Sequence, residues 1–291
     1  MITDPQEPIN IGEMVLHHTA DAWTIPIDLP FFHHTFHLAR WPDVHIGALT
    51  LNLSPTKHVY FMLLAALLVF LMMWIAGRQL QKTRQTGEHP RGFSGAVEAA
   101  VLWVRNEIAL PNIPHGERFA PLIVALFFFV LFCNLLGLIP SGASPTGNLA
   151  VTAALAILVF IVIEIGGLIK IGPKAYLRTI FPHVEGLPPA GAAVMAIGMA
   201  PIEVIGKIVK PFALAVRLFG NMTAGHFVIL SLFGIIFIFG RFEGLNWGVG
   251  LLTAALVTAI MLLELIVALL QAYVFALLSA VFIGLMQEEH H

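Results

Sequence analysis

Residues 203–226 read EVIGKIVKPFALAVRLFGNMTAGH, and they place polar side chains inside a long apolar stretch of the 291-residue chain. An α-helix turns by about 100° per residue, which puts five of these side chains on one stripe about 80° wide. They are Glu203, Lys207, Lys210, Arg217 and Asn221. A charge at the centre of a bilayer costs about 2.5–3.5 kcal/mol on insertion scales. The stripe is therefore expected to face protein or water rather than lipid.

The composition of the whole chain is typical of a membrane protein. Hydrophobic residues make up 58% of the chain and charged residues 11%, whereas a soluble domain has about 25% charged residues. The net charge of −2 gives no reason to expect a nucleic-acid partner. The chain has one cysteine, Cys133, so an intrachain disulfide is excluded.

Five apolar segments follow a polar N-terminal region. They cover roughly residues 58–76, 119–140, 147–169, 190–239 and 248–286. A spanning helix needs about 20 apolar residues, so the first three are predicted to be single spans. The last two are too long for one perpendicular crossing and are predicted to be strongly tilted or broken. We therefore predict an all-α membrane protein, with a membrane domain at 57–291 and a loosely structured extramembrane arm at 1–56.

Residues 93–108, FSGAVEAAVLWVRNEI, predict an amphipathic helix that is too short to span a membrane. Its apolar face would carry Phe93, Val97, Val101, Val104 and Ile108. We expect this helix to lie on the cytoplasmic surface of the membrane, and a helix in a soluble loop remains the alternative.

The distribution of basic residues predicts the orientation of the chain. Six lie between the first two spans and three follow the third span: Arg78, Lys82, Arg84, Arg91, Arg105, Arg118, Lys170, Lys174 and Arg178. The 141–146 loop has none, and the 240–247 loop has only Arg241. Because basic loops stay in the cytoplasm, the N-terminus is predicted outside and the C-terminus inside.

Other polar groups lie in the apolar segments. On the last segment Thr253 and Gln271 fall within about 20° of Glu264, so the three share a face. His226 lies about 140° from the first stripe and faces another surface. An imidazole can exchange protons near neutral pH, and a buried carboxyl group can do the same. The alternative is that these charges only pair and hold helices together, which is favoured for Lys207 and Lys210. Glu164, in VFIVIEIGG, is left without a role.

The sequence predicts no metal, no cofactor and no catalytic residue. His33 and His37 have helical i, i+4 spacing, but no cysteine or firm helix supports a metal site, so a solvated histidine-rich arm is favoured. No GxxxxGK[ST] phosphate loop is present.

Residues 210–226, KPFALAVRLFGNMTAGH, resemble the most distinctive motif of subunit a, the proton-conducting stator of rotary F-type ATP synthases. A second match joins ELI at 264–266 to LQAYVF at 270–275 and ends in EEH at 288–290. NLLGLIP at 134–140 and PNI at 111–113 support it. The similarity runs from roughly residue 55 to the C-terminus.

This resemblance implies a non-catalytic subunit of a proton-translocating ATP synthase in a bacterial inner membrane. The implied partners are the c-ring, whose hairpin subunits each carry one membrane carboxylate, the b subunits of the peripheral stalk, and membrane lipid. The last two helices would form a steeply tilted hairpin against the ring.

The resemblance also implies roles for individual residues. The family arginine maps onto Arg217, which would separate two offset half-channels. Asn221 and Gln271 map onto the external half-channel, and Glu203 maps onto a carboxylate of the cytoplasmic one. In the best-known bacterial members a glutamate follows Ala-Gly and a histidine lies seven residues before the glutamine. Here these positions hold His226 and Glu264, so the acid and the imidazole have exchanged helices.

Two other classes of membrane protein remain open at this point. A self-contained transporter or channel could line its own pathway with the polar stripe, although such folds often contain internal repeats and none is visible. A structural or haem-holding scaffold is the third interpretation. The histidines show no arrangement of axial ligands on facing helices.

Overall fold

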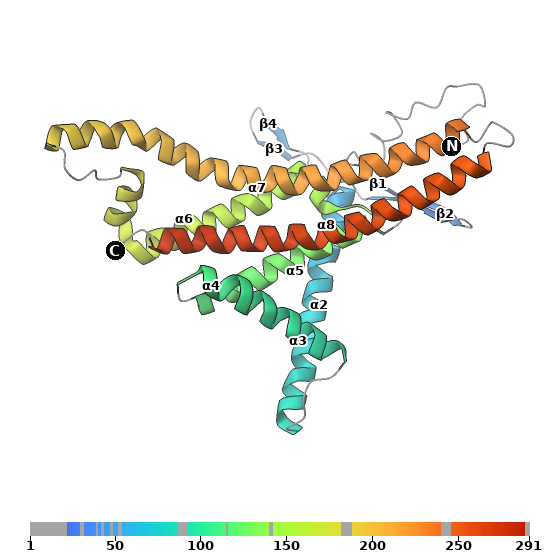
Figure 1. Ribbon diagram of the computed structural model, residues 1–291, viewed down its shortest axis with the longest axis horizontal. Coiled ribbons are helices and arrows are strands. Elements are labelled where there is room, and N and C mark those ends of the chain that lie inside the picture. The colour runs from blue at the N-terminus through green and yellow to red at the C-terminus, as the bar shows by residue number, and fades with distance from the viewer. Residues whose placement is uncertain are drawn as a thin grey trace. The chain divides into compact units, whose positions relative to one another are not determined.

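The computed structural model of the chain describes residues 22–29, 32–38, 40–41, 44–46, 49–51, 54–86, 92–114, 116–139, 142–181, 188–239 and 246–288. Helices account for most of them, as predicted (Figure 1). The long helices are α2 (Lys57–Thr86), α5 (Ala120–Gly137), α6 (Leu149–Ile180), α7 (Pro189–Phe239) and α8 (Asn246–Glu288). These helices coincide with the five predicted apolar segments. Four of them, α2, α5, α6 and α8, contain stretches long and apolar enough to cross a membrane.

The N-terminal region contains strands that the sequence analysis did not predict. β1 (Thr24–Leu29) pairs antiparallel with β2 (Phe32–His37), and β3 (Val44–Ile46) pairs with β4 (Leu49–Leu51). Residues four apart on a strand are about 13 Å apart, so His33 and His37 are not neighbours as they would be on a helix. The boundary after residue 56 concerns position in a membrane and stays a prediction.

The last two helices are each continuous. α7 has 51 residues and runs through Pro201 and Pro211, and α8 has 43 residues. At about 1.5 Å per residue both are far longer than the hydrocarbon core of about 30 Å. Each helix is unbroken, which argues against the predicted broken pairs, while a tilted crossing stays a prediction.

The predicted amphipathic helix is present. It consists of α3 (Phe93–Trp103), a π-helical turn η1 (Val104–Ala109) and the short α4 (Leu110–Asn112). Val97, Val104 and Ile108 are buried, whereas Phe93 at the first position is 55% exposed. The ring of Trp103 lies 6.0 Å from that of Phe127 on α5 and 5.8 Å from that of Tyr273 on α8. Part of this helix is thus covered by protein.

The chain divides into two compact units, and each is assembled from separate stretches. The first unit comprises Met1–Leu64, Cys133–Asn148 and Phe219–Leu270. The second comprises Ala65–Phe132, Leu149–Leu218 and Gln271–His291. α7 leaves the second unit after Leu218, and α8 leaves the first after Leu270, so both helices contribute to both units.

The second unit holds the main apolar core, in which η1, α5, α6, α7 and α8 meet. Its largest fully buried members are Phe275, Ile108, Ile113, Ile123 and Leu218. Its helices approach closely where side chains are small. A Cβ at Gly284 would overlap the backbone oxygen of Asn112, so α8 lies directly against α4 there.

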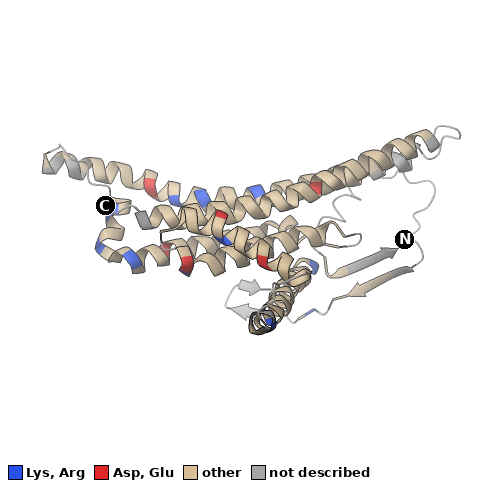
Figure 2. Ribbon diagram, turned by 60° about the horizontal axis from the view of Figure 1, so that its bottom comes forward, with Lys and Arg blue, Asp and Glu red and all other residues tan. Residues whose placement is uncertain are grey.

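Large apolar side chains are also exposed along α7 and α8. Ile202, Ile205 and Phe212 on α7 and Leu251 and Ile266 on α8 each expose more than half of their surface. Lys, Arg, Asp and Glu are sparse along these helices (Figure 2). A water-facing surface of this composition would be unfavourable, so it is suited to lipid or to a protein partner.

Candidate functional site

A network of buried hydrogen bonds connects several elements of the first unit. The hydroxyl group of Thr146 donates to Oδ1 of Asn134 at 2.6 Å and lies 2.7 Å from Oγ of Ser144. Nδ2 of Asn134 donates to the carbonyl oxygen of Ala268 on α8 at 3.3 Å. Nδ1 of His58 on α2 lies 3.1 Å from the carbonyl oxygen of Ser144. The turn η3 (Pro145–Gly147) is thereby fixed among α2, α5 and α8.

The sequence analysis found only part of this network. Asn134 belongs to the NLLGLIP motif, but the roles of Ser144, Thr146 and His58 were missed. The available signal was a pair of hydroxyl residues flanking Pro145 in a short loop without basic residues between two spans. Thr146 is 0% exposed, which hydropathy alone does not predict for a loop residue.

Glu264 on α8 and His226 on α7 lie beside this network in the same unit. Glu264 is 8% exposed, and a Cβ added at Gly225 would overlap its Oε1 atom. The carboxyl group therefore packs against the backbone of α7 next to His226. A larger residue at position 225 would force the Glu264 carboxyl group to move.

Three polar atoms in this part of the first unit are buried without a hydrogen-bond partner among the described residues. They are Oγ1 of Thr223, Nε2 of His226 and Oε1 of Glu264. Leaving a buried donor or acceptor unsatisfied costs about 1–3 kcal/mol. Such groups are rare in folded proteins and often mark sites that handle water or protons.

The predicted polar face of α8 is buried. Thr253, Glu264 and Gln271 are all almost inaccessible, as expected if they share one side of the helix. Gln271 lies on the part of α8 that belongs to the second unit.

Arg217 and Asn221 differ from these residues because both are exposed on α7. They are one helical turn apart, so they share a face. The neighbouring Leu214 and Leu218 are buried, which places the guanidinium group on the side of α7 away from the core of the second unit. Among the residues that the structure describes, no carboxylate forms an ion pair with Arg217.

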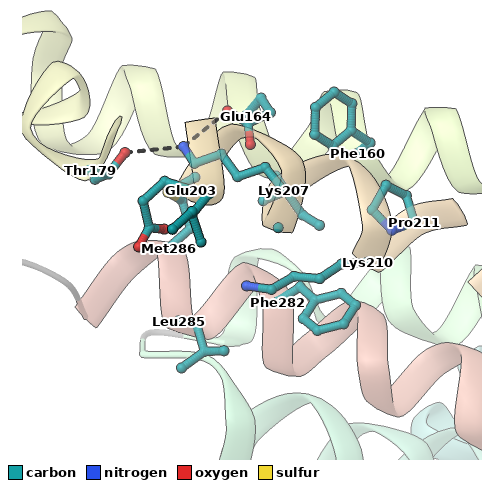
Figure 3. Close-up of a pocket in the computed structure, with 13 residues that line it drawn as sticks. Phe160, Glu164, Thr179, Glu203, Lys207, Lys210, Pro211, Phe282, Leu285 and Met286 are labelled. Atoms are coloured by element: carbon teal, nitrogen blue, oxygen red, sulfur yellow. Dashed lines mark hydrogen bonds and ion pairs between the residues drawn. The ribbon is translucent and has the colours of Figure 1, made fainter. Parts of the chain in front are cut away.

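Glu203 lies in a pocket of about 290 Å³ within the second unit (Figure 3). Glu164, Lys207 and Lys210 also line this pocket, together with Thr179 and Pro211. Three residues of the predicted stripe, Glu203, Lys207 and Lys210, thus line the same pocket as Glu164. The sequence had left Glu164 without a role.

The family model of the ATP synthase A chain matches residues 59–284. The chain belongs to the ATP synthase subunit a family. The matched residues include both the charged residues of the pocket around Glu203 and the buried group around His226 and Glu264.

Several bacterial relatives are similar over most of the chain. An ATP synthase subunit a of Chloroherpeton thalassium is 40% identical over 271 residues, which cover 93% of this chain and 75% of the relative. A relative from Chlorobaculum tepidum, ATP synthase subunit a 2, is 40% identical over 94% of this chain and 72% of its own length. The subunit of Myxococcus xanthus is 44% identical over 81% of this chain and 73% of its own length.

Family membership decides between the classes that the sequence left open. The chain is a multi-pass membrane subunit of a bacterial ATP synthase, the proton-conducting stator subunit of its F0 sector, and it is non-catalytic. A self-contained transporter and a haem scaffold are therefore excluded.

The buried network yields a stability prediction. Thr146→Val keeps the shape of the side chain but removes the hydroxyl group, which leaves Oδ1 of Asn134 without its donor. We expect a loss of about 1–3 kcal/mol, measured as a lower midpoint for thermal unfolding of the purified complex. Thr258→Val is the matched control, because the exposed hydroxyl group of Thr258 only donates to Ala254 of its own helix. Equal midpoints for the two variants would contradict the prediction.

Proposed function

We propose that this subunit conducts protons through two offset half-channels. The external one contains Asn221, His226, Glu264 and Gln271, and the cytoplasmic one contains Glu203. Protons pass from the external half-channel to a carboxylate of the c-ring and leave that carboxylate near Glu203. The b subunits of the peripheral stalk hold the chain while the ring rotates.

The buried, unpaired atoms of His226 and Glu264 are the observation that carries the external path. An imidazole and a carboxyl group can each bind and release a proton, and here each has a polar atom that bonds to none of the described residues. A pair that only linked two helices would instead satisfy both groups with each other or with the backbone. The exchanged positions of acid and imidazole keep both groups where α7 and α8 meet at Gly225.

Arg217 is suited to separate the two paths. It lies along α7 between Glu203 and His226, and its guanidinium group stays charged at any physiological pH. Its exposure and its lack of an ion pair within the described residues leave it available to a carboxylate from another chain. A fixed positive charge also opposes the passage of a proton directly from one half-channel to the other.

Replacing Arg217 tests the function as a whole. Arg217→Ala is expected to abolish proton-driven ATP synthesis in reconstituted vesicles and to permit a passive proton leak. Arg217→Lys should rescue poorly, because an ammonium group lacks the planar guanidinium fork and can lose its proton when buried. Arg178→Ala, an exposed arginine near the end of α6, is the control. Near-normal synthesis with Arg217→Ala would overturn the mechanism.

The external path is tested at its two titratable groups. Glu264→Gln and His226→Gln keep polar side chains of similar size but do not relay protons in the physiological range. Each variant is expected to slow ATP-driven proton pumping several-fold while the complex still assembles. Glu107→Gln, which changes an exposed carboxylate on η1, should pump normally. The proposed path is wrong if both single variants pump at the rate of the control.

Orientation is the remaining part of the proposal, with the N-terminus outside and the C-terminus in the cytoplasm. It is supported by the basic residues at the C-terminal ends of α2 and α6. Cysteines at the exposed positions Asn106 and Thr35 should react with a membrane-impermeant thiol reagent from the cytoplasm and from outside, respectively. The buried Cys133 should remain unreactive and serve as the internal control. Labelling from the opposite sides would reverse the topology.

A further inference from the structure

Glu164 is a charged residue in the middle of α6 for which the proposed half-channels give no role. It lies in the sequence VFIVIEIGG, where a charge needs a compensating partner. Its side chain is 16% exposed. The contacts that compensate it come from two places, the bent end of its own helix and α7.

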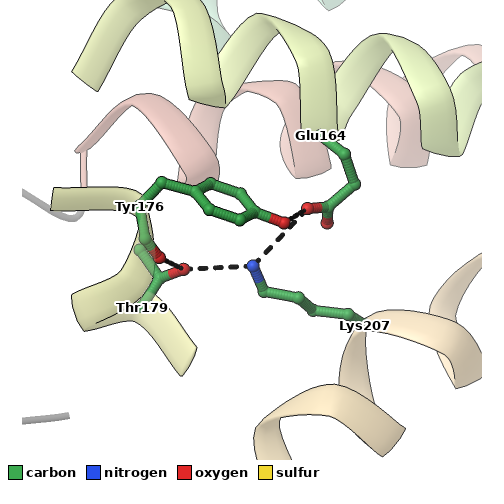
Figure 4. Close-up of polar contacts among 4 residues, drawn as sticks. All are labelled: Glu164, Tyr176, Thr179 and Lys207. Atoms are coloured by element: carbon green, nitrogen blue, oxygen red, sulfur yellow. Dashed lines mark hydrogen bonds and ion pairs between the residues drawn. The ribbon is translucent and has the colours of Figure 1, made fainter. Parts of the chain in front are cut away.

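The bend in α6 occurs at Gly172, where φ is 79° and ψ is 162°. This region of backbone conformation is essentially restricted to glycine, and Pro173 follows directly. Tyr176 follows Glu164 by twelve residues, so on a straight helix the two would lie about 18 Å apart along the axis. The bend instead turns residues 173–180 back, so that Tyr176 and Thr179 reach the carboxyl group and its partner (Figure 4).

Two donors converge on one oxygen of Glu164. The phenolic hydroxyl group of Tyr176 donates a hydrogen bond to Oε2, and Nζ of Lys207 lies 3.6 Å from the same atom. Lys207 also donates to Oγ1 of Thr179 at 3.0 Å, and its ammonium group lies 4.5 Å from the centre of the Tyr176 ring. Both contacts thus reach Oε2 of Glu164, and neither donor bonds to Oε1.

The same carboxyl group lines the pocket that contains Glu203. The pocket of about 290 Å³ has room for several water molecules. Two carboxylates and two lysines line it, so its charges balance, and Lys210 is held with Nζ 5.5 Å from the ring of Phe282. A purely structural ion pair between α6 and α7 would not require a second carboxylate or a polar pocket beside it.

We propose that Glu164 is a second proton-transfer carboxylate of the cytoplasmic half-channel, acting in series with Glu203. During synthesis Glu203 releases a proton to water in the pocket, and the Glu164 carboxylate accepts a proton from that water. Glu164 then releases the proton to the cytoplasmic solvent and returns to its charged form, so no net change remains. Tyr176 and Lys207 are positioning residues that hold the carboxylate toward the pocket. This inference rests on the proposed function, in which Glu203 belongs to the cytoplasmic path.

The test uses the complete ATP synthase reconstituted in vesicles with Glu164→Gln, Glu164→Asp or Tyr176→Phe. Three quantities are measured: ATP synthesis driven by an imposed proton gradient, passive proton conduction after the soluble head is removed, and the amount of this subunit in the purified complex. Glu164→Gln should reduce both rates several-fold with a normal amount of subunit. Glu164→Asp should restore most of the loss, because it keeps a titratable group, and Tyr176→Phe should slow transfer less than Glu164→Gln. Glu107→Gln is the matched control for the change in charge.

Each alternative outcome overturns the inference. Rates for Glu164→Gln equal to those of Glu107→Gln would show that no proton passes through Glu164. Loss of the subunit from the complex in both Glu164→Gln and Glu164→Asp would show that the residue only holds the bend of α6 against α7. Arg217→Ala in the same vesicles separates the two proposals. If Arg217→Ala is inactive and Glu164→Gln is normal, only the role of Glu164 fails, whereas an active Arg217→Ala removes the proposed function as well.

Discussion

In hydrocarbon every charged or hydrogen-bonding group needs a partner, and most features of this subunit follow from that requirement. Buried polar side chains in the first unit are either linked, as in the network through Thr146 and Asn134, or left unpaired in a small group that includes His226 and Glu264. In the second unit Glu164 and Lys207 compensate each other's charge. The contrast separates groups whose hydrogen bonds link helices from groups that have no such bond among the described residues.

Close approach between helices decides where these groups can lie. Glycine at position 225 lets the Glu264 carboxyl group lie against the backbone of α7, and glycine at position 284 lets α8 pack directly against the backbone of Asn112. Gly137 in the first unit also permits close packing. A Cβ there would overlap the side chain of Ser144 and crowd that of Met222. Helices in membranes gain stability mainly from such packing and from interhelical hydrogen bonds. Glycine thus contributes to the site although it carries no functional group.

The two polar regions differ in how their charges are balanced. Two carboxylates and two lysines line the pocket around Glu203, and Glu164 and Lys207 among them form an ion pair. The group around Glu264 and His226 instead contains buried polar atoms that bond to none of the described residues. Arg217 lies between them along α7 and is exposed. In the proposed mechanism one region delivers protons to the ring, the other receives them, and Arg217 opposes direct passage between the two.

The sequence by itself determined the apolar segments, the amphipathic helix at 93–108, the polar stripe and the family arginine, because hydropathy and helical periodicity depend on residues close together in the chain. The alternation of Ile25, Ile27 and Leu29 with polar residues or proline was a local signal for β1 that the prolines obscured. Only the tertiary structure revealed that Glu164 meets Lys207, that Thr146 bonds Asn134, and that Glu264 packs on Gly225. Those contacts depend on how α6 packs on α7, how the 145–147 turn folds back on α5, and how closely α7 approaches α8, and none of these follows from a one-dimensional pattern.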